Sequence, residues 1–465
     1  MVDIVTRVNN VVNGFVWGPF GLALLLCTGL WLSVRTGFFQ FRRMGYWLKH
    51  TIGAIFTNKD VTAHTSKEDM AISQFQSMCT ALAGTIGTGN IVGVATAIVS
   101  GGPGAIFWMW VMALLGMMTS FAENVLGVYY RRKNEKGEWN GGAMYYLTDG
   151  LGAKPGCKAV GKVLAVLFAC FCILASFGIG NMSQCNSIAQ GLSGSFGIPS
   201  GIVGAVTAVL LGAVLLGGLK RLSRVTETLV PFMALFYMAG CVVILCINHA
   251  AIIPAFKSIF VAAFDPQAIL GGAAGITVRQ AMRYGVARGL FSNEAGMGST
   301  PHAHALAKVK RPQDQGEIAI VSVFIDTFIV LTLTAMVILT SGMLNPGAPD
   351  GLQGTELAQA AFKASLGSAG MAFVAICMLF FAFSTIIGWY FFGEQNVKAL
   401  FGHKAVKVYA AIVVICIVIG SALHVDLVWN LSDLFNGLMV FPNLIALLAL
   451  SGLVAKAAHD KDIMK

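Results

Sequence analysis

The sequence predicts an all-α polytopic membrane protein with eleven transmembrane helices: one extra N-terminal helix followed by two inverted five-helix repeats, each opening with a broken helix. Three observations predict this fold: the composition, the recurrence of apolar windows, and two interrupted helices. Of the 465 residues, 56% are hydrophobic and 11% are charged, and the mean hydropathy is +0.75. Soluble domains carry more charge, whereas repeated apolar windows of about 20 residues are typical of membrane spans.

The predicted spans follow these apolar windows. Glycine, proline or charged clusters bound most of them, for instance GGPG at 101–104. The spans are expected near residues 15–34, 72–99, 104–130, 160–189, 200–219, 224–248, 274–300, 316–341, 369–396, 404–423 and 427–455.

Lysine and arginine are distributed unevenly between the connecting segments. They concentrate after the first, third, fifth, seventh and ninth spans and in the C-terminal tail, whereas the opposite side carries Arg7, Lys257 and Lys363. Because cytoplasmic loops carry the basic excess, we expect the N-terminus outside and the C-terminus in the cytoplasm. The net charge of +10 follows from these loops, so we expect the lipid bilayer and no nucleic acid as a partner. The ten cysteines show no metal or disulfide spacing.

The second and seventh spans contain glycine-rich interruptions. The first reads GTIGTGNIVG, from Gly84 to Gly93, and the second reads GLFSNEAGMGS, from Gly289 to Ser299. Irregular backbone at mid-membrane is tolerated only against protein or a water-filled cavity. Five helices separate the two breaks, and an odd number inverts the second half, so paired breaks of this kind indicate a binding site. The predicted divisions are an N-terminal helix with an amphipathic segment at 1–71, repeats at 72–248 and 249–455, and a tail at 456–465.

The first break offers groups of both signs. Glycine takes unusual backbone angles cheaply, so Gly87, Thr88 and Gly89 can expose the N–H groups that begin the second half-helix, and such a terminus suits a carboxylate. The carbonyl groups that end the first half-helix suit a cation. They belong to Ala83, Thr85 and Ile86. The alternative is that the glycines only permit close helix packing, as the GxxxG spacing of Gly89 and Gly93 would.

Four ionisable residues lie in or near the seventh span, where charges are expensive and usually paired or functional. Arg279 and Arg283 stand near its outer end, which favours snorkelling or an extracellular gate pair. Glu294 lies within the break. It either forms a structural pair, for example with Arg288, or contacts a bound ligand directly.

Three residues in other spans offer oxygen ligands for an alkali cation. Asp326 is the acid inside the eighth span, and Ser384 and Thr385 lie midway along the ninth. Such oxygens replace the hydration shell of an ion. Serine and threonine in membranes also commonly bond back to their own helix, so this alternative stays open. His302 and His304 lack a third ligand at suitable spacing and are interpreted as helix-end residues.

Several motifs resemble one known family. The run GGPGAIFWMWVMALLG, from Gly101 to Gly116, resembles the signature of the alanine or glycine:cation symporter family, which comprises bacterial and archaeal sodium/alanine carriers. The stretches around both breaks and FAFSTIIGWYF are similar to that family as well, so the resemblance covers essentially the whole chain. It implies a fold shared with the leucine transporter and the neurotransmitter:sodium symporters, with ten helices in two inverted repeats plus an extra helix.

The resemblance also implies roles for single residues. Thr88 and Gly89 match the amides that hold a substrate carboxylate. The residues that match sodium ligands are Asn90, Ser292, Asp326, Ser384 and Thr385. Glu294 departs from the pattern, because an uncharged residue is usual there. The residues expected beside the breaks, which leave room for a side chain about the size of hydrogen or methyl, are Phe291, Gly296, Met297 and Trp389.

The expected function is symport of alanine or glycine with Na+ across the bacterial or archaeal plasma membrane, by alternating access and without a further cofactor. Coupling to H+ is the alternative, because Glu294 or Asp326 could titrate as readily as coordinate an ion. A channel normally needs a ring of subunits or a continuous polar file. An enzyme needs an acid, base or metal constellation, for which the sequence offers little.

Overall fold

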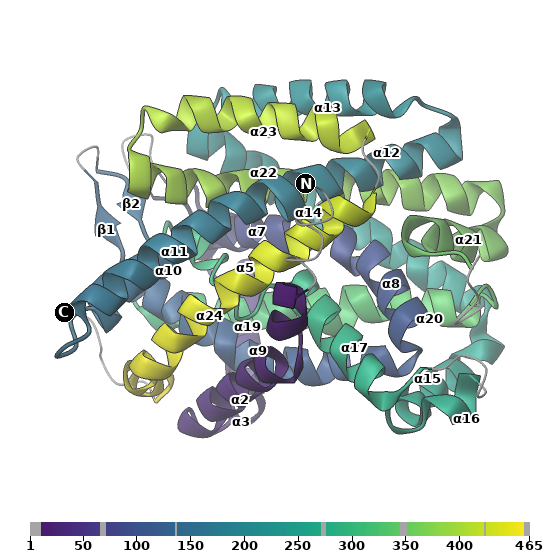
Figure 1. Cartoon of the computed structure of the whole chain (residues 1–465), viewed down its shortest axis with the longest axis horizontal. Helices are drawn as coiled ribbons and strands as arrows, with labels where there is room; N and C mark the ends of the chain where they lie inside the picture. Colours follow the sequence, from purple (N-terminus) through teal and green to yellow (C-terminus); the bar gives the residue numbers. More distant parts are fainter. Residues whose placement is uncertain are drawn as a thin grey trace.

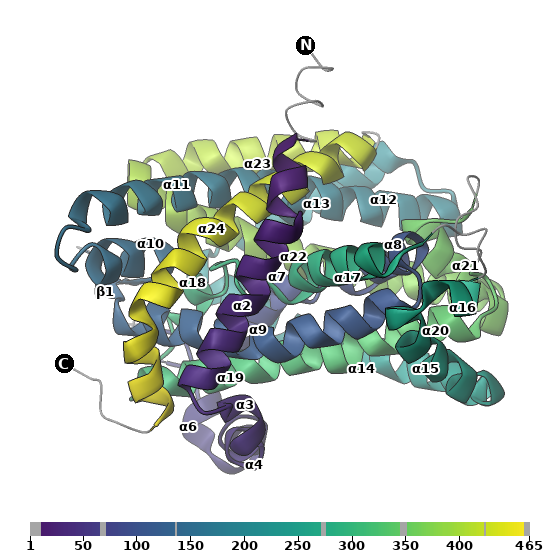
Figure 2. The same ribbon diagram turned by 60° about the horizontal axis from the view of Figure 1, so that its bottom comes forward.

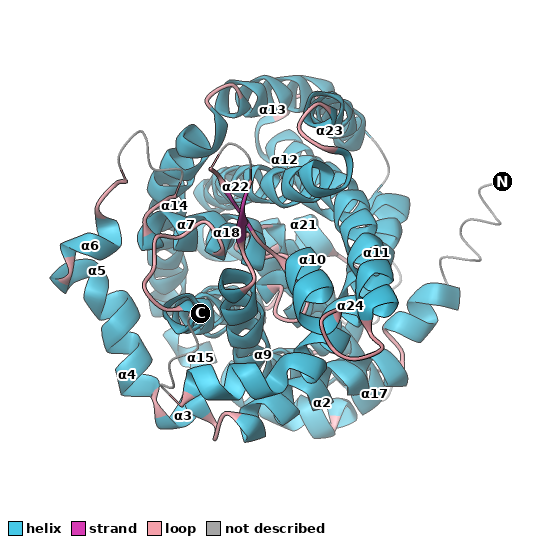
Figure 3. Ribbon diagram, turned by 90° about the vertical axis from the view of Figure 1, so that its left-hand side faces the viewer, coloured by secondary structure: helices cyan, strands magenta, loops and turns pink. Residues whose placement is uncertain are grey.

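Most of the residues that the structure describes are helical (Figure 3). The computed structural model describes residues 11–65, 71–134, 137–270, 276–344, 351–422 and 425–459. Within them, β1 (Arg132–Lys133) and β2 (Trp139–Asn140) form a short antiparallel hairpin. Arg7 and most of the predicted tail at 456–465 lie outside the described residues.

Seven helical stretches among the described residues are long and apolar enough to cross a membrane. They are α9 (Gly104–Tyr129); α11 (Lys158–Phe177) with η4 (Gly178–Met182) and α12 (Ser183–Phe196); α14 (Gly218–Ile247); α19 (Pro312–Val323) with η6 (Phe324–Leu331) and α20 (Thr332–Thr340); α22 (Ser368–Phe401); α23 (Ala405–Ala422); and Asp433–Ala458 within α24 (Val425–Ala458). Shorter apolar helices are α2 (Pro19–Arg35), α8 (Val92–Gly101), α13 (Ser200–Leu215) and α15 (His249–Phe264). The helical membrane fold is confirmed, while the count of eleven spans and the inverted repeat stay predictions.

Other helices lie in the predicted connections. α15 is followed by α16 (Pro266–Leu270), and α21 (Gly354–Leu366) precedes α22. After the hairpin come α10 (Ala143–Tyr145) and η3 (Tyr146–Leu151). The segment after α2 forms α3 (Phe39–Arg42), α4 (Met44–Leu48), η1 (Lys49–Gly53), α5 (Ala54–Thr57) and α6 (Lys59–Thr62). This segment exposes Phe41, Met44 and Phe56, a pattern typical of an amphipathic helix at a membrane surface.

The second predicted span is interrupted where its glycines lie. α7 (Gln74–Thr85) ends at Ile86, whose ψ of 92° leaves the helical region. The chain then passes through extended Gly87 and the short 3-10 turn η2 (Thr88–Asn90) before α8 begins. The turn is fully enclosed by protein, because every residue of η2 is buried. The predicted first break is confirmed.

The seventh predicted span is interrupted as well. α17 (Val278–Asn293) ends at Glu294, whose φ of 54° is left-handed, and α18 (Pro301–His304) follows after a loop. Gly296 and Gly298 in this loop have φ values of 110° and 75°, which glycine adopts without a steric penalty. The predicted second break is also confirmed, and α18 carries both histidines as helix-end residues.

In Figures 1 and 2, α17 lies on the near side of the helical bundle and α7 lies deeper within it. α17 packs against α8 and α9, and α7 packs against α14 and α22. Glycines permit the closest of these contacts. A Cβ at Gly388 of α22 would lie 2.6 Å from the backbone nitrogen of Gly84, and one at Gly285 of α17 would lie 2.4 Å from the carbonyl oxygen of Ala105. The first break is therefore held against α22, and α17, which leads into the second break, is held against α9.

Candidate functional site

The two breaks meet at Asp326. This residue lies in η6 and is fully buried. Its carboxylate accepts hydrogen bonds from Asn90 Nδ2 of the first break at 2.7 Å and from Ser292 Oγ of α17 at 2.9 Å. Thr327 Oγ1 donates a third at 2.9 Å. The structure therefore brings together three of the predicted cation ligands from three separate elements, and it adds Thr327, which the sequence reasoning missed.

The charge of this cluster favours a cation. None of the ion pairs between described residues includes Asp326. A buried carboxylate without a counter-charge costs several kcal/mol, which hydrogen bonds from neutral donors offset only in part. A small cation coordinated by the Asp326 carboxylate and the hydroxyl oxygens of Ser292 and Thr327 would supply the missing charge.

A second set of oxygens lies where α22 crosses the end of α7. Thr385 Oγ1 donates to the carbonyl oxygen of Phe381 at 3.0 Å and lies 3.4 Å from that of Ile86. Ser384 Oγ donates to the same Phe381 carbonyl at 2.8 Å, and it also lies 3.3 Å from Met233 Sδ of α14. Both hydroxyls bond back to their own helix, which was the alternative interpretation, but Thr385 also reaches the first break.

Of the remaining carbonyl residues of the first break, Ala83 lies on the same side. A Cβ at Gly388 would lie 3.1 Å from the carbonyl carbon of Ala83, so Ala83 faces α22. Thr85 bonds back to Leu82 through its hydroxyl, at 3.3 Å. The predicted cation ligands thus form two groups, one around Asp326 and one between α7 and α22.

The N–H end of the first break already has a side-chain partner. Gln184 of α12 accepts at Oε1 from the backbone N–H of Thr88 at 3.3 Å and from the Thr88 hydroxyl at 3.0 Å. Its Nε2 donates to the carbonyl oxygen of Ile179 at 3.0 Å, which fixes the orientation of the amide. Gly89 faces Phe291, because a Cβ at Gly89 would lie 2.9 Å from the Phe291 ring. A bound carboxylate would replace the Gln184 oxygen at the Thr88 amide.

Glu294 pairs with neutral donors of the site rather than with Arg288. Trp389 Nε1 of α22 donates to Glu294 Oε1 at 2.7 Å, and Ser299 Oγ donates to Oε2. The buried indole is thereby locked in place against η4, where a Cβ at Gly180 would lie 2.3 Å from Trp389 Cβ. The suggested Glu294–Arg288 pair is wrong.

The loop after Glu294 is held by two further buried residues. Glu123 Oε1 of α9 accepts from the backbone N–H of Gly298 at 2.9 Å, and Asn443 Nδ2 of α24 donates to the carbonyl oxygen of Gly296 at 2.9 Å. Gly296 faces α2 and α9, since a Cβ built at Gly296 would lie 3.6 Å from side-chain atoms of Leu25 and Thr119. These contacts place Gly296 in the support of the loop, whereas Met297 is fully buried and lines the pocket described next.

Arg288 pairs with Asp433 of α24 instead. Its two terminal nitrogens donate to Asp433 Oδ1 at 3.0 Å and Oδ2 at 2.9 Å. The guanidinium also lies over the Phe291 ring, 5.6 Å from its centroid. A pocket of about 340 Å³ opens beside this ion pair, and Arg283 is one of the residues that line it. Arg279 is exposed on the first turn of α17. Asp433 and Gln184 were missed by the sequence reasoning, although each is a polar residue inside an apolar span, which is itself a signal.

The far end of the second break is held by Arg131, which follows α9. Its guanidinium donates to the carbonyl oxygens of Ala305 at 2.9 Å and Ala307 at 2.6 Å, just after α18. Burial lowers the pKa of Arg131 to about 10, so the side chain stays cationic at neutral pH. The break is therefore enclosed between Arg131 at one end and Arg288 at the other.

Comparison with known proteins identifies the family of the chain. The family model described as the sodium:alanine symporter family matches residues 2–462. The chain belongs to the sodium:alanine symporter family. The resemblance drawn from the sequence motifs is thereby confirmed.

Curated relatives of this family match along nearly their whole length. The sodium/alanine symporter AgcS of Methanococcus maripaludis is 46% identical over 454 residues, which are 97% of this chain and 96% of that protein. The probable sodium/glutamine symporter GlnT of Bacillus subtilis is 37% identical and covers 99% of this chain and 91% of its own. The putative sodium/proton-dependent alanine carrier YrbD of Bacillus subtilis is 36% identical, with 100% and 93% covered.

Solved transporter structures share the fold at low sequence identity. MhsT in complex with L-phenylalanine superposes with a TM-score of 0.58 at 14% identity and covers 83% of this chain and 98% of its own. A manganese transporter from Eremococcus coleocola gives 0.51 at 14% identity, with 87% and 81% covered. As a member of the sodium:alanine symporter family, the chain is a transporter of the cell membrane and not an enzyme, and the family supports Na+-coupled amino-acid symport.

Proposed function

We propose that the chain imports small neutral amino acids, alanine first and glycine second, together with Na+ by alternating access. The observation that carries this proposal is the convergence of both broken helices on Asp326, a buried carboxylate with oxygen ligands around it and no cationic partner among the described ion pairs. A cation bound there joins η2, α17 and η6, so its arrival and departure affect both halves of the chain.

The proposed topology has eleven spans. The N-terminal helix within 1–71 stands outside two inverted repeats at 72–248 and 249–455, with the N-terminus outside the cell and the tail in the cytoplasm. The loop charges support this orientation, and the shared fold of solved transporters supports the architecture. The Arg288–Asp433 pair then faces the outside, and Arg131 faces the cytoplasm.

The proposed ion sites follow the two groups of oxygens. The first holds Na+ at Asp326 and Ser292 with Thr327 and, after its amide turns, the Asn90 oxygen. The second lies between the carbonyl groups of Ala83 and Ile86 and the hydroxyl of Thr385, with Ser384 beside it. Both use only hard oxygen donors, the ligand type that an alkali cation prefers.

The proposed amino-acid site uses the N–H groups that begin the second half-helix, at the end of the first break opposite its carbonyl groups. The substrate carboxylate binds the N–H groups of Thr88 and Gly89, and the Gln184 amide turns to present its NH₂ group to that carboxylate. Phe291, Met297 and Trp389 limit the side chain of the substrate. Because Glu294 and η4 hold the Trp389 indole from two sides, the pocket cannot widen by simple rotation of this ring, which favours alanine and glycine over larger amino acids.

Uptake into vesicles tests the proposal. The purified protein is reconstituted and labelled alanine is supplied with an inward Na+ gradient at fixed pH. We expect uphill accumulation that collapses when a sodium ionophore dissipates the gradient. Asp326→Asn removes the single negative charge from the cluster, and we expect accumulation to fall by at least about 100-fold, since a buried charge–charge interaction is worth about 3 kcal/mol or more.

Asp149→Asn is the matched control, because it also removes one carboxylate. Asp149 lies away from the cluster and pairs with Arg132 of the partly exposed hairpin. We expect this variant to keep wild-type uptake. Sodium-independent accumulation driven by a pH gradient would replace the proposal with proton coupling, and gradient-independent leak would indicate a channel.

A further inference from the structure

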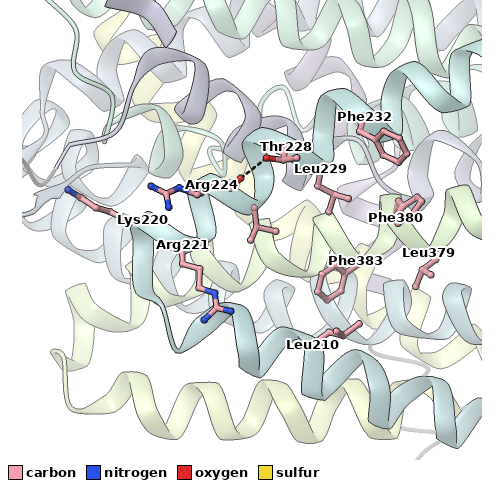
Figure 4. Close-up of a pocket in the computed structure, with 11 residues that line it drawn as sticks. Leu210, Lys220, Arg221, Arg224, Thr228, Leu229, Phe232, Leu379, Phe380 and Phe383 are labelled. Carbon is pink, nitrogen blue, oxygen red and sulfur yellow. Dashed lines mark hydrogen bonds between the residues drawn. The ribbon is translucent and has the colours of Figure 1, made fainter. Parts of the chain in front are cut away.

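A large groove lies on the outer surface of the helical bundle, away from the site described above. It runs between α13, α14 and α22 and has a volume of about 1160 Å³ (Figure 4). Pockets for small metabolites occupy roughly 300–1,000 Å³, so this groove accommodates a longer ligand. In Figure 4 the charged groups of Lys220, Arg221 and Arg224 gather toward one end, and Phe232, Phe380 and Leu379 lie toward the other.

The basic end of the groove is formed by the first two turns of α14. Arg221 and Arg224 are exposed, and none of the ion pairs between described residues includes either of them. The nearby acid Glu227 is engaged elsewhere, since its Oε2 lies 2.9 Å from His64 Nε2 and accepts from Gln76 Nε2 at 3.0 Å. The guanidinium groups of Arg221 and Arg224 are therefore available to an anion.

A glycine at the turn between α13 and α14 creates the space for Arg221. A Cβ at Gly217 would lie 2.1 Å from Arg221 Cδ. Any larger residue would push the arginine side chain away from the turn. The groove is thus shaped by the local sequence and does not arise only from the general roughness of a helical surface.

The other end of the groove is apolar and aromatic. Phe232 of α14 and Phe380 of α22 pack edge to face with ring centroids 5.8 Å apart, and Phe383 lines the same wall. Phe232 is 53% exposed and Leu210 of α13 is 46% exposed. From Lys220 to Phe232 the helix rises about 18 Å at roughly 1.5 Å per residue, slightly more than half of a hydrocarbon core of about 30 Å.

We infer that this groove binds one anionic phospholipid from the leaflet at its basic end. The phosphate lies among Lys220, Arg221 and Arg224, and an acyl chain lies along Phe232, Phe380 and Phe383. Basic pockets between transmembrane helices recognise anionic head groups in this way. A soluble anion would leave the aromatic wall unused, and an apolar helix from a second copy would bring no counter-charge to Arg221 and Arg224.

The bound lipid also contacts helices that carry the transport site. On the far side of α14, Met233 contacts Ser384 of α22 at 3.3 Å, and Thr226 Oγ1 lies 3.1 Å from Thr80 Oγ1 of α7. A lipid wedged between α14 and α22 therefore stabilises the pair of helices against which the first break packs. We expect anionic lipid to raise the rate of Na+-driven uptake.

Native mass spectrometry tests the binding directly and independently of transport. The purified protein is mixed with phosphatidylglycerol or phosphatidylcholine of identical acyl chains. We expect one retained phosphatidylglycerol per chain and little phosphatidylcholine. Replacing Lys220, Arg221 and Arg224 together by Gln should reduce retention at least tenfold, since each basic residue near a membrane surface contributes about fivefold. Equal retention of both lipids, or unchanged retention in the triple variant, would overturn the inference.

Two further variants separate the possible occupants. Lys158→Gln with Lys162→Gln removes exposed cations from the first turns of α11 and should leave retention unchanged. Leu210→Trp fills the apolar part without changing charge and should reduce retention. If retention survives Leu210→Trp and glycerol phosphate competes for binding, the groove is a site for soluble phosphates. A doubled mass that the triple variant abolishes would indicate self-association.

Vesicle uptake supplies the functional arm. In pure phosphatidylcholine the triple variant and the wild type should transport alanine equally, and added phosphatidylglycerol should accelerate only the wild type. Loss of the lipid effect with intact sodium dependence would contradict the lipid site alone, whereas loss of sodium dependence in the wild type would contradict only the proposed function.

Discussion

Asp326 sets the electrical balance of the site. Its carboxylate is buried among Asn90, Ser292 and Thr327, all of them neutral donors. A zwitterionic amino acid adds no net charge, so in the proposed site the coupling ion would be the species that neutralises the aspartate. In the proposed sites the cation and the amino acid bind at opposite ends of one short turn, so each would stabilise the conformation that the other needs, and this mutual stabilisation would couple their binding.

Gln184 offers a test of the proposed carboxylate site. Gln184→Glu places a negative charge beside the Thr88 amide, and like charges about 4 Å apart repel by about 4 kcal/mol at an effective dielectric constant of 20. We expect the KM for alanine to rise at least tenfold, measured by initial uptake rates at saturating Na+. Gln190→Glu on the exposed face of the same helix is the control and should leave KM unchanged. An unaltered KM in Gln184→Glu would contradict the placement of the carboxylate.

Sequence reasoning identified single residues where a polar side chain lay in an apolar span. Asp326 and Asn90 stood out as polar groups in apolar spans, and the structure joins them. A pair of Glu294 with Arg288 was one of two alternatives for Glu294, but residues six apart are not neighbours on a helix surface, where only i+3 and i+4 positions are. The true partner, Asp433, lies 145 positions away along the chain, a distance that no local pattern reveals.

The first broken helix depends on the absence of a side chain at Gly87. A Cβ there would lie 2.3 Å from Thr385 Oγ1, although the backbone of Gly87, with φ of −139°, is one that any residue adopts. Gly87→Ala therefore acts by overpacking, which costs about 1–3 kcal/mol. We expect a lower Tm in detergent and a loss of most alanine uptake.

Gly93 provides the matched control in the same span. No atom of the described residues lies within 4 Å of a Cβ built there, so Gly93→Ala should keep both Tm and uptake. The double variant Gly87→Ala with Thr385→Ala removes the clashing oxygen and should restore Tm but not the sodium dependence of uptake. Equal Tm in both single variants would show that Gly87 is not a steric requirement.

The elements themselves were only partly predictable. Apolar windows located the long helices and the glycines located both breaks, because each has a direct signature in composition. α15 and α21 were not predicted. Each carries a lysine, Lys257 or Lys363, in a connection between spans, and α15 also contains Pro254. Such helices are stabilised by packing on the bundle, which a single sequence does not display.

At the scale of the whole molecule, the Arg288–Asp433 ion pair links α17 to α24. The two side chains are 13% and 21% exposed, so water screens the pair only in part. Asp433→Asn removes the charge but keeps one acceptor. We expect the outward-facing state to be favoured and uptake to slow by about tenfold, equivalent to about 1.4 kcal/mol, with little change in alanine binding.

Separate measurements of binding and flux distinguish this role from a direct contact with substrate. Equilibrium binding of labelled alanine in detergent should stay close to wild type, while flux in vesicles falls. Arg283→Gln, on the same pocket wall, is the control and should affect neither quantity strongly. A large loss of binding in Asp433→Asn would place Asp433 in the substrate site instead of in an ion pair that only links α17 to α24.

The arrangement of the whole bundle depends on which helices pack together, and the composition of the helices does not reveal this. Gly388 against Gly84 and Gly285 against Ala105 determine which helices approach most closely. The two breaks five helices apart predicted an inverted repeat, and the family resemblance implied the same architecture. Physical reasoning from the residues alone reached the class of protein and the two breaks, and it left the identity of neighbouring helices open.

The π-helical turn η6 makes the length of its segment as important as its composition. A π-helix accommodates one residue more than an α-helix of similar hydrogen bonding. Deleting a single residue between Phe324 and Leu331 would therefore let the span close into a regular α-helix and remain well formed. The flanking halves of the helix would keep nearly their present orientation, whereas the residues of the turn itself would shift, so Asp326 would lose its alignment with Asn90. A one-residue gap here in any related sequence would mark a carrier whose ion site has been rebuilt or lost.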